Sequence, residues 1–183
     1  FRNHKPSILV GTQMIAKGHD IPNVTLVGIV DADQSLYQSH YKSAERTFAL
    51  ITQVSGRAGR SDKLGKVILQ TYNPKHYVYK FAKLYNYKGF FDKEINLRKA
   101  TGFPPYSTIV RLLISADSEE VAYEKTKNII QKVREIKEQD KENFVYLDAM
   151  KSTVGRVKNK FRFQVLMRVV NWEKIRKQVY TLC

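Results

Sequence analysis

The sequence predicts an α/β unit with a mostly parallel sheet, followed by a small α+β domain with the element order β-α-β-β-α. With 183 residues, 43% of them hydrophobic and 27% charged, the chain can bury the core of one or two modest domains. Its first third alternates short Val/Ile/Leu runs with a helical pattern, as in a parallel sheet covered on both faces. After Pro104 and Pro105, which exclude a helix, the pattern changes. We therefore expect an α/β unit over 1–72, a helical connector over 73–105 and an α+β domain over 106–183.

In the first unit, apolar runs predict strands at 8–10, 24–30 and 67–71, and helical spacing predicts a helix at 43–54. The connector is rich in Tyr, Phe and Lys. One face of its predicted helix carries Val78, Phe81, Ala82 and Tyr85. Aromatic residues at this spacing are more often core than a platform for stacking nucleic-acid bases, so we expect them to be buried.

The second domain begins with a predicted strand at 108–114 and a helix at 118–138, for which Ser118 is a suitable N-cap. Two strands are expected at 144–147 and 161–168, the second with strict alternation, and a last helix starts after Asn171. The stripe of the long helix that should face the core consists of Ala122, Thr126, Ile129, Val133 and Ile136.

Charge points to a polyanionic partner, with nucleic acid first, because 32 Lys and Arg against 17 Asp and Glu give a net charge of +15. Of these, 23 basic and 12 acidic residues lie after residue 72. Residues 150–172 contain six basic residues and no acid, which makes them a better candidate for contacts to phosphate or carboxylate than the helix at 118–138, where both signs mix. A surface that is basic only for solubility remains the alternative.

Several classes are excluded by composition. The one cysteine, Cys183, rules out an internal disulfide and a thiolate zinc cluster, and it favours a reducing compartment. No apolar run approaches the 18 or so residues of a membrane span, so we expect a soluble protein without a membrane partner. The first residues contain neither an initiator Met nor a signal sequence, from which we expect a fragment of a larger chain.

The most informative string is Gln-Val-Ser-Gly-Arg-Ala-Gly-Arg at residues 53–60. Arg57 and Arg60 each follow a glycine, Gly56 and Gly59, whose lack of a side chain lets a ligand approach the backbone closely. This compact cationic turn predicts binding of a phosphate group. The alternative is a helix that ends at a glycine and is followed by two solvated arginines.

Residues 53–60 resemble motif VI of superfamily 2 helicases (QxxGRxGR), and GTQMIAKGHD at residues 11–20 resembles their motif V. The longer string from Gly11 to Arg60 is similar to the bacterial replication-restart family of these helicases, and the similarity extends, more weakly, through the C-terminal domain. The resemblance implies a 3′ to 5′ DNA helicase in which two RecA-like lobes clamp ATP and Mg²⁺. This chain would hold part of the second lobe.

The resemblance also implies residue roles. Arg57 and Arg60 would be arginine fingers on the γ-phosphate, and Gln53 would contact the nucleotide or the attacking water. Gly18 and Asp20 would couple nucleotide to DNA, although Asp20 equally suits a turn before Pro22. The residues that would touch the tracked DNA strand are Thr12 and Lys17.

The chain has no P-loop string, so it is not expected to hydrolyse ATP alone. Asp31 and Asp33 imitate a magnesium-binding aspartate at the end of a strand, and we interpret them as loop residues. The family's zinc-binding Cys-rich module is also absent from this chain, so we expect no cofactor here. A cytoplasmic, nucleoid-associated location follows from the family.

The partners that the family implies are branched and single-stranded DNA, other primosome proteins, and the acidic C-terminal tail of single-stranded DNA-binding protein. Lys160, Arg162 and Gln164 match the positions that would contact this tail. The alternative function is a non-enzymatic basic module that binds nucleic acid or an acidic peptide, with the first 72 residues a remnant of a motor.

Overall fold

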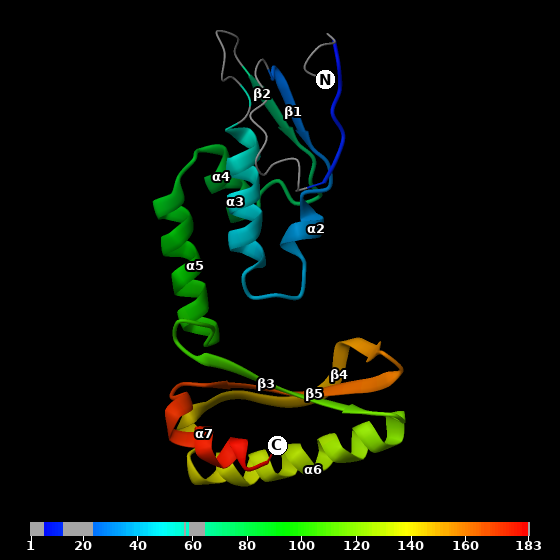
Figure 1. Cartoon of the computed structure of the whole chain (residues 1–183). Coiled ribbons are helices and arrows are strands. Elements are labelled where there is room, and N and C mark those ends of the chain that lie inside the picture. Colours follow the sequence, from blue (N-terminus) through cyan, green and yellow to red (C-terminus); the bar gives the residue numbers. More distant parts are fainter. Residues whose placement is uncertain (1–5, 13–23, 57, 59–64, 183) are drawn as a thin grey trace. The chain divides into compact units, whose positions relative to one another are not determined.

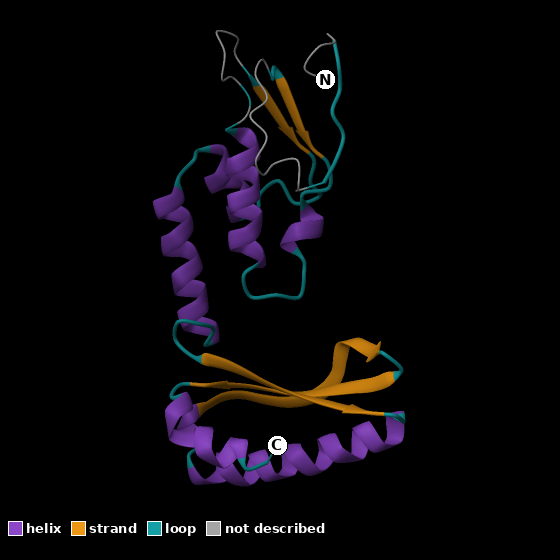
Figure 2. Ribbon diagram, viewed as in Figure 1, coloured by secondary structure: helices purple, strands orange, loops and turns teal. Residues whose placement is uncertain are grey.

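The computed structural model describes residues 6–12, 24–56, 58 and 65–182. The chain forms two compact units, Phe1–Ile95 and Asn96–Cys183 (Figure 1). The mixed α/β class predicted from the sequence is confirmed, because the first unit contains a parallel sheet and the second an antiparallel one (Figure 2). Within the described ranges, no helix has the length and apolar character that a membrane span requires.

The first unit has the order β1 (Leu26–Ile29), α2 (Asp33–Leu36), α3 (Ser43–Ser55), β2 (Lys66–Leu69), α4 (Tyr77–Lys83) and the start of α5 (Tyr87–Thr101). Strands β1 and β2 pair in parallel, with Leu26 opposite Lys66. Antiparallel neighbours can be joined by a tight turn, whereas parallel ones need a crossover, which α2 and α3 provide here.

Two expectations for this sheet are wrong. Residues 8–10 form no strand, and their Ile8 and Val10 are 91% and 86% exposed. A strand requires a neighbour, and among the described residues β1 and β2 pair only with each other. Nor do the described residues cover both faces of the sheet: most side chains of β2 are exposed, as is Leu26 in β1.

The core of the first unit lies among its helices. The Phe48 ring of α3 stacks on the Phe90 ring of α5 at 4.3 Å between centroids. The aromatic connector is only partly core: Tyr79 and Phe90 are buried and Phe81 packs against them, as the spacing predicted. The expectation is wrong for Tyr72, Tyr85, Tyr87 and Phe91, which are exposed, Tyr85 lying beyond the end of α4 at φ 50°. The buried apolar residues are Ala32, Leu36, Phe48, Ile51, Val78, Tyr79, Ala82 and Phe90.

The second unit confirms the predicted β-α-β-β-α order. It contains β3 (Thr108–Ala116), α6 (Glu119–Gln139), a short 3₁₀ turn η1 (Lys141–Asn143), β4 (Phe144–Val157), β5 (Lys160–Val169) and α7 (Trp172–Tyr180). The three strands form an antiparallel sheet in the order β3-β5-β4. Helices α6 and α7 lie along one face of this sheet (Figures 1 and 2).

The core of the second unit is formed where α6 and α7 meet β5. Val165, Met167 and Val169 alternate along β5 and are completely buried. Helix α6 begins as predicted, because the Ser118 hydroxyl accepts a hydrogen bond from the Val121 N–H at 3.3 Å. Its buried stripe also matches the prediction, except that Ile130 replaces Ile129 as the fully buried residue.

Strand β4 is much longer than the 144–147 predicted from its pattern. It continues to Val157, although its pairing with β5 is irregular between Lys151 and Arg156. Ser, Thr and Gly in this stretch obscure the alternation of a strand, so the sequence looks like a loop. Lys158 and Asn159 then form a two-residue turn at φ 48° and 62°, which is the geometry of a tight β-hairpin.

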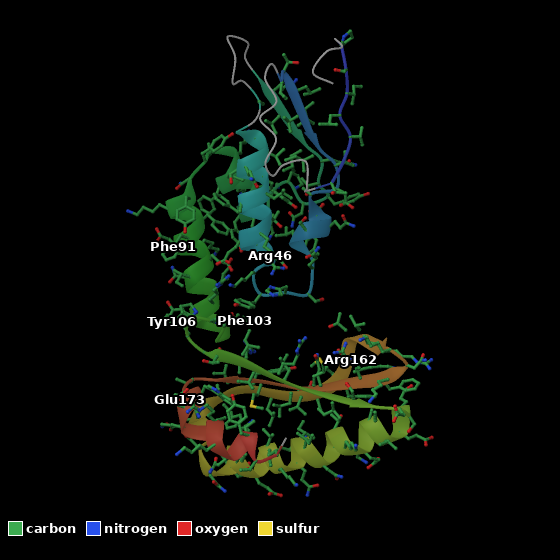
Figure 3. The ribbon with its side chains drawn as sticks, viewed as in Figure 1. Arg46, Phe91, Phe103, Tyr106, Arg162 and Glu173 are labelled. Carbon is green, nitrogen blue, oxygen red and sulfur yellow. The ribbon has the colours of Figure 1, made fainter. Side chains whose placement is uncertain are left out.

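The chain enters the second unit through a well-anchored turn after α5. The Arg168 guanidinium stacks 4.2 Å from the centroid of the Phe103 ring, and its Nη1 donates to the Thr101 carbonyl at 2.6 Å. Gly102 has φ 60° and lies directly against the Val145 side chain, so it has neither the conformation nor the space for a larger residue. Figure 3 labels Phe103 at this turn, just before the two prolines.

Candidate nucleotide and nucleic-acid sites

Helix α3 leads into the motif VI string. It is anchored through Phe48 and Ile51, and at its start the Ser43 hydroxyl hydrogen bonds to the carbonyl oxygens of Gln38 and His40, both at 2.7 Å. Gln53, two residues after Ile51, lies on the exposed side of the helix. The packing of α3 therefore leaves the Gln53 amide open to solvent, where a ligand can reach it.

Gly56 caps α3 without using the special conformational freedom of glycine. Its φ and ψ are −68° and −1°, and its N–H donates to the Thr52 carbonyl at 3.0 Å. A glycine that terminates a helix usually adopts a positive φ. A Cβ at this position would meet only ordinary contacts, the nearest being the Thr52 carbonyl oxygen at 3.4 Å. Within the described residues, neither backbone strain nor packing explains why residue 56 is glycine.

The other predicted motor residues are only partly covered by the structure. Arg57, Arg60, Lys17, Gly18 and Asp20 lie outside the described residues. Thr12 lies in the exposed segment 6–12. Their assignment to nucleotide and DNA contacts therefore stays a prediction from the motifs.

A buried carboxylate, which sequence reasoning placed in a loop, joins the ends of the two parallel strands. Asp33 is the first residue of α2 and is only 6% exposed. Its carboxylate accepts hydrogen bonds from the Thr71 hydroxyl at 2.8 Å, the Tyr72 N–H at 2.7 Å and the Tyr79 hydroxyl at 2.7 Å. We call this group of four residues the Asp33 network.

The Asp33 network is electrostatically biased toward an ionised carboxylate. The hydrogen bond from Tyr79, followed by those from Tyr72 and Thr71, lowers the pKa of Asp33 although burial opposes this shift. Burial, together with the hydrogen bond to Asp33, raises the pKa of Tyr79 far above its usual value. With three donors already on its carboxylate, Asp33 is a structural anchor for β1, β2 and α4, whereas Asp31 is exposed. The sequence signal that we missed is the pair Asp33 and Thr71, each just beyond a parallel strand.

The three residues predicted to meet an acidic tail occupy alternate positions on β5. Lys160 is exposed, Arg162 is half-buried and Gln164 is buried. By alternation Arg162 and Gln164 belong to the sheet face opposite α6 and α7, where Figure 3 labels Arg162. Lys160, the first residue of β5, instead lines a pocket together with residues of α6. Gln164 pairs with Leu113 on β3 and Met150 on β4, and its Oε1 has no hydrogen-bond partner among the described residues.

A shallow pocket of about 420 Å³ lies where β3 passes into α6. Lys160 from β5, Lys125 and the apolar Val121 from α6 all line it. The turn contributes Ser115, Ala116, Asp117 and Ser118, so one carboxylate lies beside the two cations. The structure thus brings Lys160 to a second cation that sequence reasoning did not single out, because Lys125 lies on a helix of mixed charge. Arg162 and Gln164 do not line this pocket.

Comparison with known proteins shows that the first part of the chain belongs to a helicase domain. Residues 1–62, which contain both motif strings, match the helicase conserved C-terminal domain, the second RecA-like lobe of a helicase. The sequence resemblance to helicases is therefore confirmed for this part of the chain.

The particular relatives are bacterial replication restart proteins. The chain is 41% identical to "Replication restart protein PriA" of Bacillus subtilis (strain 168) over 169 residues. This alignment covers 92% of this chain and 20% of that protein. Its identity to PriA of Synechocystis sp. is 39% over 176 residues, covering 96% of this chain and 21% of that protein. For PriA of Borreliella burgdorferi it is 30% over 179 residues, covering 98% and 27%. The predicted similarity to the replication-restart family is confirmed, and the chain spans about a fifth to a quarter of the length of these relatives.

Proposed function

We propose that this chain is the C-terminal part of an ATP-dependent 3′ to 5′ DNA helicase, which restarts stalled replication forks by binding branched DNA and loading the primosome. The observation that carries the proposal is the ordered pair of motif V and motif VI strings inside a helicase C-terminal domain match. The similarity to PriA covers more than 90% of the chain, so it extends the proposal to the second unit.

In this proposal Arg57 and Arg60 reach a γ-phosphate that is held by the first lobe of the intact parent, with ATP and Mg²⁺ between the lobes. Cations aimed at a transferring phosphoryl group are worth about 10³–10⁵ in rate. Gln53 acts beside them on the nucleotide or the attacking water, and its exposed position at the end of α3 is compatible with this role.

The DNA-facing residues of the proposed motor come from motif V. Thr12 and Lys17 contact phosphates of the tracked strand, and Gly18 with Asp20 couples this contact to the nucleotide. The exposure of Thr12 agrees with such a contact. Zinc belongs to a module of the parent outside this sequence, and the DNA partner implies a cytoplasmic location at the nucleoid.

Unwinding polarity of the intact parent tests the proposal. We expect ATP and Mg²⁺ to drive separation of a partial duplex that carries a 3′ single-stranded tail, and to leave the matched 5′-tailed duplex intact, because the motor tracks from 3′ to 5′. Strand separation on gels measures both. Tight DNA binding without any ATP-dependent unwinding would contradict the helicase and favour a basic binding module.

A second contact proposed for the same protein is the acidic C-terminal tail of single-stranded DNA-binding protein at Lys160, Arg162 and Gln164. Two features support it: Lys160 and Lys125 line one shallow pocket, and the apolar Val121 lies in the same wall. A peptide that ends in carboxylates and carries apolar side chains is complementary to such a site. Other primosome proteins are further partners in this proposal.

Charge reversal at Lys160 should weaken capture of this tail. We expect Lys160→Glu to lower the affinity of this chain for a synthetic acidic tail peptide about tenfold, since one attraction of at most about 1 kcal/mol becomes a repulsion. Isothermal titration at fixed salt measures the change. Lys132→Glu, which reverses an exposed lysine of α6, is the matched control and should change the affinity less than about twofold. Equal affinities of the wild-type chain and Lys160→Glu for the peptide would show that the tail does not bind at this site.

A further inference from the structure

Large apolar side chains remain exposed at the corner where α4 passes into α5. We define the aromatic corner as residues 80–93, which lie wholly within the first unit. Single exposed apolar residues are ordinary on a protein surface, whereas a contiguous exposed group is typical of a binding surface. Four such residues lie within eight positions of one another in the aromatic corner: Leu84, Tyr85, Tyr87 and Phe91. The corner is therefore a candidate binding surface.

A packed backbone presents these side chains. Tyr85 adopts φ 50°, and the Asn86 side-chain oxygen accepts a hydrogen bond from the Gly89 N–H at 2.8 Å in the first turn of α5. Helices α4 and α5 approach each other so closely here that a Cβ on Gly89 would lie 2.5 Å from the Phe81 ring. The aromatic corner is thus a defined turn between two packed helices, and the small size of Gly89 permits the approach.

The rings of Tyr87 and Phe91 form an exposed pair on α5, where Figure 3 labels Phe91. Their centroids lie 6.3 Å apart and their planes are tilted by 33°. The Tyr87 ring also contacts the buried Phe48 ring at 6.2 Å, so the core helps to fix the pair. Nevertheless Tyr87 is 65% and Phe91 47% exposed. Among the described residues no Lys or Arg is stacked over either ring, so both rings can receive a planar ligand.

Positive charge accompanies the ring pair. Asp92 is the one acid among residues 80–93, whose net charge is +3. The next acid along α5, Glu94, is buried and accepts a hydrogen bond from the Tyr77 hydroxyl at 2.6 Å. The four basic residues of the corner are all exposed, and within the described part of the chain none of them forms an ion pair: Lys80, Lys83, Lys88 and Lys93.

Exposed rings together with lysines fit a single strand of DNA. Proteins that bind single strands without sequence preference stack the bases on aromatic side chains and hold the phosphates with cations. The bases of a duplex are stacked on one another, so a duplex would leave the ring pair without a partner. An apolar protein surface could cover the rings, but it would desolvate the neighbouring lysines without pairing them.

We infer that the aromatic corner binds single-stranded DNA, with bases stacked on Tyr87 and Phe91 and phosphates held by lysines such as Lys83 and Lys88. The inference rests on the proposed function, because unwinding produces the single strand, and it adds a DNA contact outside motifs V and VI. Every base has a flat face, so this site should not distinguish one sequence from another.

A strand without bases separates stacking from charge. We expect this chain to bind a short labelled thymidine strand about tenfold or more tighter than an abasic strand of the same length, which carries the same phosphates. Tyr87→Ala combined with Phe91→Ala should reduce this preference to about twofold or less, because the variant loses both rings and no charge. Fluorescence anisotropy at fixed salt measures the two affinities.

The matched control is Tyr123→Ala combined with Tyr180→Ala, which removes two rings of nearly the same exposure, 49% and 66%, from α6 and α7. Because these rings lie outside the aromatic corner, the control should keep the preference for bases within about twofold of the wild-type value. Tyr87→Phe combined with Phe91→Tyr keeps both rings and should also retain it. Thermal unfolding of every variant checks the fold.

The lysines are tested by a separate variant. Lys83→Gln combined with Lys88→Gln should keep the preference for bases, because the rings remain. The slope of log affinity against log salt for the thymidine strand should become shallower by about 0.7 for each phosphate that the variant no longer neutralises. An unchanged slope would remove these two lysines from the site.

Equal affinities of the wild-type chain for the thymidine and abasic strands, or no binding of either, would overturn the stacking site. So would a loss of the preference that is equally large in the control variant. If the variant without Tyr87 and Phe91 keeps the full preference, the exposed rings are a surface for another protein segment instead. Each of these results leaves the helicase proposal untouched, since that proposal depends on ATP-dependent unwinding by the parent.

Discussion

Arg57→Ala in the intact parent protein is expected to lower DNA-stimulated ATP hydrolysis by about 10³-fold or more, while DNA binding stays close to normal. The arginine would neutralise charge that develops on the transferred phosphoryl group, so its loss raises the barrier of the chemical step without removing a contact to DNA. Arg60→Ala should behave similarly. Steady-state ATP turnover with saturating single-stranded DNA, alongside anisotropy of a labelled strand, separates the two effects.

Arg46→Ala is the matched control for this experiment, because Arg46 is an exposed arginine of α3, the helix that leads into the motif VI string, and is labelled in Figure 3. It removes the same charge seven residues before Gln53 and should leave turnover nearly unchanged. If Arg57→Ala and Arg60→Ala both hydrolyse ATP at the wild-type rate, the finger assignment is wrong and the basic binding module becomes the better interpretation.

Asp33→Ala is expected to lower the free energy of unfolding of the first unit by about 3–5 kcal/mol. The substitution removes the acceptor from three donors and leaves the hydroxyl of the buried Tyr79 without its partner. Amide hydrogen exchange in α3 measures the loss, and exchange in α6 of the second unit is the internal reference. Asp31→Ala, at an exposed neighbouring position, should cost far less.

The same network predicts a pH dependence of definite sign. Because the pKa of Asp33 is lower in the folded chain than its ordinary value of 3.8, its ionised form adds stability that is fully present above pH values near 4 to 5. This contribution is lost as the pH falls through the folded pKa. The stability difference between the wild-type chain and Asp33→Asn should therefore shrink in acid, and a difference that does not change with pH would show that the ionised carboxylate is not what the network stabilises.

The second unit was more predictable from sequence than the first. Its long helix and alternating β5 bury their apolar faces against each other, so local pattern and tertiary packing agree. The extent of β4 was missed because Ser152, Thr153 and Gly155 interrupt the alternation, yet pairing with β5 carries the strand past them. The prediction for residues 8–10 was wrong in the opposite sense, because it placed a strand where none forms. An apolar run becomes a strand only when a neighbour pairs with it.

The candidate sites differ in the same way: those made of neighbouring residues could be predicted from the sequence, and those made of distant residues could not. Motifs V and VI are contiguous strings and were visible at once, whereas the Asp33 network joins residues up to 46 positions apart and depends on the ends of two strands meeting. Gln164 lies between Phe163 and Val165, a pattern that predicts an outward-facing side chain, but its place in the central strand, between Leu113 and Met150, buries it. Long-range neighbours of this kind leave no periodic trace in the sequence.

The two-residue turn at Lys158 and Asn159 has no spare length. The length of the β4–β5 hairpin is therefore set by how many residues β4 and β5 contribute, not by loop flexibility. Homologues that lengthen both strands by two residues would extend the hairpin past β3, which now pairs with β5 as far as Phe161, and keep each cation on its present side. A change of one residue per strand would exchange the two sides beyond the insertion, so natural length variation here should come in even steps.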